Sequence, residues 1–141
     1  MHRLAFVVGS LWGVFLNAAE PTPLTVTVTG FKHSTGVALC KLFTSRVAFP
    51  TRAAQQATMA PIVGTVARCL FAAPPSGAVA IAVAHDENGN GQLDKNFFGV
   101  PVEPYGFSRD AMRTFGPPSF DEAAIVSSGQ PLTLTVSLRA P

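Results

Sequence analysis

Two segments near opposite ends of the chain alternate apolar and polar residues with a period of two. Leu24, Val26 and Val28 alternate with threonines, and a similar alternation runs from Leu132 to Arg139. Successive side chains of a β-strand point to opposite faces of its sheet. Each segment therefore predicts a strand with one buried and one exposed face.

Further apolar segments predict strands between these two. They cover residues 36–44, 64–71 and 78–85, with a weaker run at 123–127. Residues 51–60 are expected to form a short helix, capped by Thr51 and stopped by Pro61. Short strands, with twelve Gly and twelve Pro to form turns, predict an all-β domain. We expect an antiparallel β-sandwich of about seven strands, immunoglobulin-like or transthyretin-like, with one short helix and a long aromatic loop.

Segment 78–85 is apolar on both faces, because valine and isoleucine alternate there with alanine. Both faces should therefore be covered. The segment that follows, 95–122, is long for a simple connection and carries six aromatic residues: Phe97, Phe98, Tyr105, Phe107, Phe115 and Phe120. We expect it to fold back and pack rings near the alanine face. Exposed rings among Tyr105, Phe107 and Phe115 would form a partner surface for a glycan or another envelope protein.

The first 19 residues have the layout of a secretory signal peptide. Arg3 gives a positive start, an apolar run follows, and Ala18 and Ala19 offer small residues for cleavage. The run is short for a membrane span, although an uncleaved anchor is the alternative. Residues 20–141 are then a single β-sandwich domain that is secreted or periplasmic, with no stable membrane span after signal cleavage. The net charge of +2, with no run of like charge, argues against nucleic-acid binding.

Cys40 and Cys69 each lie within a predicted strand. An exported chain meets an oxidising compartment, so the two thiols could form a disulfide. Two buried free thiols are the alternative, because unpaired cysteine is among the most buried residue types.

The stretch after segment 78–85 has the D-x-N-x-N-G-x-x-D pattern of a calcium loop. Ca²⁺ prefers six to eight oxygen ligands in a flexible shell. Oxygen-bearing side chains at alternating positions can be aimed inward by a curling backbone, and Gly91 permits the positive φ of the turn. The predicted ligands are Asp86, Asn88, Asn90, Gln92 through its carbonyl, and Asp94.

Phe97 stands where an EF-hand would carry a bidentate Glu, so the loop is not an EF-hand. Another segment would have to complete the shell, and the candidates are Glu103, Asp110, Asp121 and Glu122. With only two carboxylates, Asp86 and Asp94, among the predicted ligands of the loop, the affinity for calcium should be modest. The alternative is a metal-free hairpin turn, since Asn-Gly is also a strong hairpin signal.

His85 lies beside this loop and could coordinate a transition metal, but its parity with the valines of the strand favours a packed core histidine. No nucleophile elbow, zinc-binding helix or phosphate loop is present in the sequence. The pattern therefore favours a binding or structural module over an enzyme. The alternative is a periplasmic hydrolase that uses His85 and the loop carboxylates.

The segments HDENGNGQLDKNFFGVPVEPYGFSRDA and FGPPSFDEAA resemble the bacterial family known as domain of unknown function 2141. The resemblance covers residues 24–139 and implies a small protein that is secreted or periplasmic, but it points to no mechanism. The matching positions are His85, Asp86, Asn88, Asn90, Gly91, Asp94, Asn96, Phe97, Gly99, Pro101, Gly106, Phe107, Ser108, Gly116, Pro117, Pro118, Ser119 and Phe120.

Overall fold

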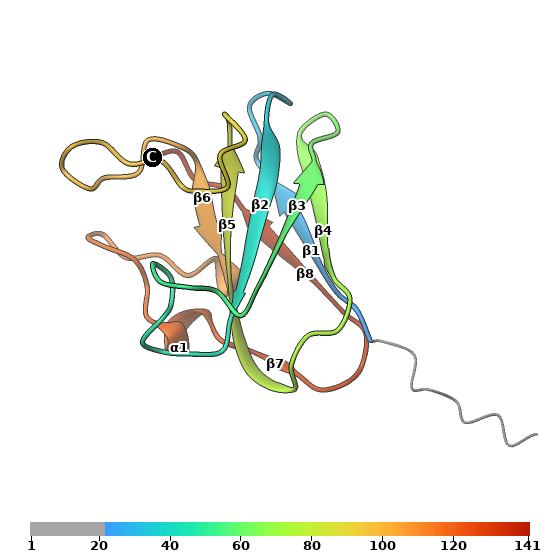
Figure 1. The fold of residues 1–141 in the computed structure, drawn as a ribbon. Coiled ribbons are helices and arrows are strands. Elements are labelled where there is room, and N and C mark those ends of the chain that lie inside the picture. Colours follow the sequence, from blue (N-terminus) through green and yellow to red (C-terminus); the bar gives the residue numbers. More distant parts are fainter. Residues whose placement is uncertain (1–21) are drawn as a thin grey trace, which may run out of the picture.

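A computed structural model describes residues 22–141 of the protein (Figure 1). The predicted signal peptide, residues 1–19, lies outside the described residues. Within the described chain, eight strands, one 3-10 turn and one short helix occur in this order: β1 (Leu24–Thr29), β2 (Val37–Phe43), β3 (Gln56–Pro61), β4 (Val66–Phe71), β5 (Gly77–Asp86), β6 (Tyr105–Phe107), η1 (Ser108–Asp110), α1 (Phe120–Ala123), β7 (Ile125–Ser127) and β8 (Leu132–Ser137). No helix of residues 22–141 is long and apolar enough to cross a membrane.

The strands form two sheets, which confirms the predicted all-β sandwich. One sheet has the order β4-β1-β8, and the other has the order β3-β2-β5-β6 with β7 also pairing with β5. The sandwich is not purely antiparallel, because β1 and β8 run parallel with Leu24 opposite Leu132. The two alternating segments of the sequence are therefore neighbours in one sheet. The immunoglobulin-like or transthyretin-like arrangement stays a prediction.

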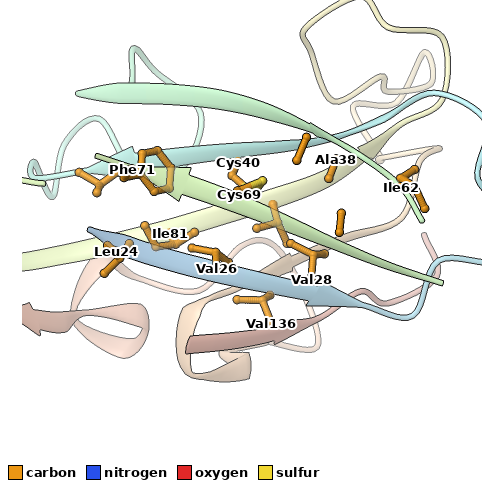
Figure 2. Close-up of a cluster of buried hydrophobic side chains, with 14 of the residues drawn as sticks. Leu24, Val26, Val28, Ala38, Cys40, Ile62, Cys69, Phe71, Ile81 and Val136 are labelled. Atoms are coloured by element: carbon orange, nitrogen blue, oxygen red, sulfur yellow. A yellow bond between two sulfur atoms is a disulfide. The ribbon is translucent and has the colours of Figure 1, made fainter. Parts of the chain in front are cut away.

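The core lies between the two sheets (Figure 2). Leu24, Val26 and Val28 are fully buried, as the period-two pattern of β1 predicts. From the opposite sheet, Val79 and Ile81 of β5 face the same core and are also fully buried. Both sheets thus contribute alternate residues to one continuous apolar layer.

A disulfide joins Cys40 of β2 to Cys69 of β4, so it links the two sheets through the core (Figure 2). Both cysteines are fully buried, and their Cα atoms are 6.4 Å apart. This separation is within the usual range for a disulfide.

The helix predicted over residues 51–60 is wrong, because the second half of that segment is strand β3. Residues Gln56–Pro61 pair antiparallel with β2, with Ala60 opposite Ala38 in the core. The helix propensity of alanine and glutamine is weak compared with pairing to a buried strand. Pro61 ends β3, an edge strand, where a missing N–H donor costs little.

The expected packing of the aromatic segment is correct in part. Phe107 and Phe120 are buried, and their rings lie 5.7 and 6.1 Å from the ring of Phe49. Phe97, Phe98 and Phe115, in contrast, are 97%, 84% and 90% exposed. The buried rings come from β6 and α1, which pack on β5, whereas the exposed rings come from turns outside the sheets.

Candidate functional site: an oxygen-rich loop beside an apolar groove

The loop of residues 86–94 follows β5 and turns around the carboxylate of Asp86. This residue is fully buried. Its Oδ1 accepts the backbone N–H of Asn90 at 3.2 Å, and its Oδ2 accepts that of Gly91 at 2.8 Å. Gly91 has a φ of 76°, which lets the chain curl back towards β5. The loop is not a tight hairpin, since β6, the strand that next pairs with β5, begins only at Tyr105.

Three predicted ligands, Asn88, Asn90 and Asp94, come together in the loop. The amide Nδ2 atoms of Asn88 and Asn90 donate to the two carboxylate oxygens of Asp94, each at 2.6 Å. Their amide oxygens accept backbone N–H groups: Asn88 Oδ1 accepts that of Asn90 at 3.2 Å, and Asn90 Oδ1 accepts that of Gln92 at 3.0 Å. An amide oxygen has two lone pairs, so each retains one that a cation could use. The carbonyl group of Gln92 as a ligand stays a prediction.

Glu103 is the candidate outside the loop that the fold brings to it. Its side chain is nearly buried, with 3% of the residue exposed. One carboxylate oxygen accepts the N–H of Glu87 at 2.6 Å, and the other accepts the N–H of Asp94 at 2.8 Å. The side chain of Glu103 therefore holds both ends of the loop by accepting hydrogen bonds from the loop's backbone.

The other three candidates have separate partners. Asp110 accepts the backbone N–H of Ser137 at 3.0 Å. Asp121 pairs with Arg46 at 2.8 Å, and Glu122 pairs with Arg113. None of the three hydrogen-bonds to the loop in the described chain, so Glu103 alone remains near enough to extend its oxygen set.

The two buried carboxyl groups of this region lack a basic partner among the described residues. Asp86 and Glu103 are both buried, yet within residues 22–141 no lysine, arginine or histidine nitrogen forms an ion pair with either. Their oxygens are satisfied by neutral backbone N–H groups. Buried charges are usually paired or bound to metal. Carboxylate and amide oxygens, which the loop carries, are ligand types that hard cations prefer.

A groove of about 670 Å³ lies over the outer face of the five-stranded sheet. Its lining includes Leu39 of β2 together with Ala82 and Ala84 of β5. The two alanines belong to the shallow face that the alternation in segment 78–85 predicts. Tyr105, Phe107 and Phe115, the candidate partner surface, all line the groove. Phe107 is buried at the floor, Tyr105 is half-buried, and Phe115 is exposed.

The groove is also basic, a property that was not predicted from the sequence. Its lining within the described chain includes Lys41, Lys95 and Arg113, but no Asp or Glu. Arg113 is held in place by Glu122, and its guanidinium lowers the pKa of that carboxyl group. The alternation along β2 could have predicted the position of Lys41. This residue shares the outer face of the strand with Leu39, whereas Cys40 faces the core.

His85 lies in the core, next to the loop but away from the groove. It is fully buried, its Nε2 is 2.7 Å from the carbonyl oxygen of Thr35, and its ring packs edge-on against Phe31 at 5.0 Å. Neither His85 nor Asp86 lines the groove. Within residues 22–141, no histidine and no acidic residue lines the groove.

These features describe a small, disulfide-linked β-sandwich with an oxygen-rich loop beside an apolar groove. The chain belongs to the family described as "uncharacterized protein conserved in bacteria (DUF2141)", whose model matches residues 26–135. No curated protein and no solved structure matches the chain.

Proposed function

We propose that this protein is an exported binding module of the cell envelope, stabilised by calcium, which holds an acidic glycan in its groove. The observation that carries the proposal is that one short segment, residues 92–95, contributes to both the oxygen-rich loop and the lining of the groove. Asp94 belongs to the loop, while Gln92, Leu93 and Lys95 on either side of it line the groove. A cation held by the loop would therefore fix one wall of the groove.

The buried carboxylates support calcium as the cation. No basic side chain of the described residues pairs with the buried carboxyl groups of Asp86 and Glu103, and the same loop carries a further carboxyl group on Asp94. Oxygen donors only, with amides and carboxylates mixed, match the preference of Ca²⁺. Extracellular calcium modules bind at about 10⁻⁴–10⁻³ M, which suits a loop with so few carboxylates.

The lining of the groove supports an acidic glycan as its ligand. Tyr105 and Phe115 offer aromatic surface, on which the apolar face of a sugar ring can lie. Lys41 and Lys95 form no ion pair in the described chain, so they are available to a carboxylate or sulfate group of the ligand. The absence of an acidic residue from the described lining would favour such a ligand over a neutral one.

Calorimetric titration with Ca²⁺, after treatment with a chelator, tests the calcium part. The protein should bind one ion, and Asp94→Asn should weaken binding by about tenfold or more, since it removes a charged ligand. Asp121→Asn is the matched control, because it removes an exposed carboxylate outside the loop. No heat in the wild type, or equal loss in the control, would contradict the proposal.

A glycan array, probed in millimolar calcium and again in chelator, tests the ligand. Bound glycans should carry acidic groups, and their signal should fall in chelator and in the Lys41→Gln variant. Binding of neutral and acidic glycans alike, or binding of none, would reject the acidic glycan. A protein partner would then be the remaining occupant, and the calorimetry would still decide the calcium site separately.

A further inference from the structure

Three side chains of types that can bind a metal meet at the end of β5. They are those of His33, His85 and Glu87, whose potential ligand atoms all lie within 4.8 Å of one another. Glu87 Oε1 is 3.5 Å from His33 Nε2 and 3.8 Å from His85 Nδ1. The rings of the two histidines have centroids 4.6 Å apart. Residues separated by about fifty positions in the sequence thus meet at one point.

His85 presents an unused lone pair to this point. Its Nε2 is 2.7 Å from the carbonyl oxygen of Thr35. A carbonyl oxygen can only accept, so in the neutral ring Nε2 carries the proton and Nδ1 is the acceptor. Nδ1 is buried, and within the described residues it has no hydrogen-bond partner. A buried acceptor without a donor is unusual in a folded protein and requires a cause.

We propose that His33, His85 and Glu87 form a site for a divalent transition-metal ion, with Zn²⁺ the expected occupant. Two imidazole nitrogens and one carboxylate oxygen are a donor set that zinc accepts while keeping a fourth position open. Ligands of a tetrahedral zinc ion lie roughly 3.4 Å apart, close to the 3.5 and 3.8 Å that separate Glu87 Oε1 from the two histidine nitrogens. The hydrogen bond from His85 Nε2 to the carbonyl oxygen of Thr35 would orient the ring. Metal-bound histidines usually make such a contact with their other ring nitrogen.

The backbone is built to hold these residues together. Gly36 follows the turn that carries His33, and it lies against the backbone of Asp86 and Glu87. A Cβ at Gly36 would lie 2.8 Å from the Cα of Glu87, closer than side chains approach. Glycine therefore permits the near contact of the two loops. Only the weak hydrogen bond from Thr35 N–H to His33 Nδ1, at 3.3 Å, would be lost when Nε2 binds metal and Nδ1 takes the proton.

This site is distinct from the oxygen-rich loop. Glu87 contributes its backbone N–H to Glu103 and its side chain to the histidines, so the two clusters share no donor atom. Nitrogen donors select borderline transition ions, whereas carboxylate and amide oxygens suit calcium. Variants of the two sites should therefore separate their metals.

Calorimetric titration of the untagged protein with Zn²⁺, in excess Ca²⁺, tests the proposal. One ion should bind, and His33→Ala and Glu87→Gln should each weaken binding by about tenfold or more. Both residues are partly exposed, so these variants should fold, which circular dichroism can verify. Asp121→Asn, which removes an exposed carboxylate that pairs with Arg46, should keep the wild-type affinity. Unchanged affinity in His33→Ala and Glu87→Gln, or equal loss in Asp121→Asn, would overturn the site.

Electron paramagnetic resonance with Cu²⁺ gives a second measurement that depends on the ligands themselves. The wild type should show coupling to two imidazole nitrogens, and His33→Ala should show coupling to one. His85 is left unchanged, because its removal would open a cavity in the core. The same nitrogen coupling in both proteins would exclude His33 as a ligand and overturn the proposal.

Discussion

Glu103 accepts the backbone N–H of Asp94 at 2.8 Å and lies nearly buried beneath the loop that Asp94 closes. The second oxygen of its carboxylate accepts the N–H of Glu87 at 2.6 Å. A single side chain from the segment before β6 therefore holds the two ends of the loop after β5. This clamp fixes the backbone of the loop that carries Asp86 and Asp94, the loop from which we infer a calcium site.

The disulfide should contribute strongly to stability, because it links the two sheets across 29 positions of sequence. Closing a loop of this length stabilises a fold by about 3–4 kcal/mol in the chain-entropy estimate. We expect the double variant Cys40→Ala with Cys69→Ala to lose at least this free energy of unfolding, as measured by urea denaturation. Reduction of the wild type should give a similar loss, and an unchanged midpoint after reduction would contradict the assignment.

Gly106 should not tolerate a larger residue, because β6 passes close to β8 at this point. A Cβ there would lie 2.7 Å from the carbonyl oxygen of Ser137 and 3.0 Å from a methyl group of Val136. Both atoms belong to a buried or paired strand, so the backbone would have to shift. Gly106→Ala should cost about 1–3 kcal/mol of stability in thermal or urea unfolding. A stable variant would show that β6 can move away from β8.

The aromatic residues of segment 95–122 should differ sharply in their effect on stability. Phe120 is buried against Phe49, so Phe120→Ala should cost about 3–5 kcal/mol. Phe115 is 90% exposed, so Phe115→Ala should change stability by less than about 0.5 kcal/mol. Denaturation of both variants checks this contrast. Glycan binding should show the reverse order among folded variants, with Phe115→Ala weakening it.

The N-terminus of α1 should respond to acid. Ser119 and Glu122 form a capping box, and Arg113 also binds the Glu122 carboxylate. The hydrogen bond from Arg113 lowers the pKa of Glu122 below its usual 4.5. The resulting stability is present above that value and is lost as the pH falls through the folded-state pKa. Urea unfolding from about pH 6 to 3 should thus show less acid sensitivity in Glu122→Gln than in the wild type; equal sensitivity would contradict this role.

The sequence was sufficient for those elements whose pattern is local. The alternation in β1 and β8 predicted both strands and their buried faces, and the apolar runs predicted β2, β4 and β5. Strand β3 was missed because its Ala and Gln residues favour helix locally, while pairing with β2 decides the outcome. Strand β6 has three residues, too few to carry a period. The parallel pairing of β1 with β8 depends on the whole topology, which no local pattern reports.

The sequence predicted the residues of the candidate loop, but it could not predict which residue outside the loop contacts it. The spacing from Asp86 to Asp94 identified the loop, and four acidic residues outside it were equal candidates. Only the fold distinguishes Glu103, since it lies just before β6, whose pairing with β5 returns the chain to the loop. The meeting of His33 with His85 likewise depends on the close approach at Gly36, a contact between segments far apart in sequence.

Thermal unfolding with and without calcium, in the wild type and in Glu103→Gln, tests the calcium site most directly. A ligand that binds only the folded state at ten times its dissociation constant adds about 1.4 kcal/mol of stability. The wild type should therefore melt at a higher temperature in calcium than in chelator, and Glu103→Gln should lose most of that increase. Equal melting temperatures of the wild type in calcium and in chelator would contradict the calcium site.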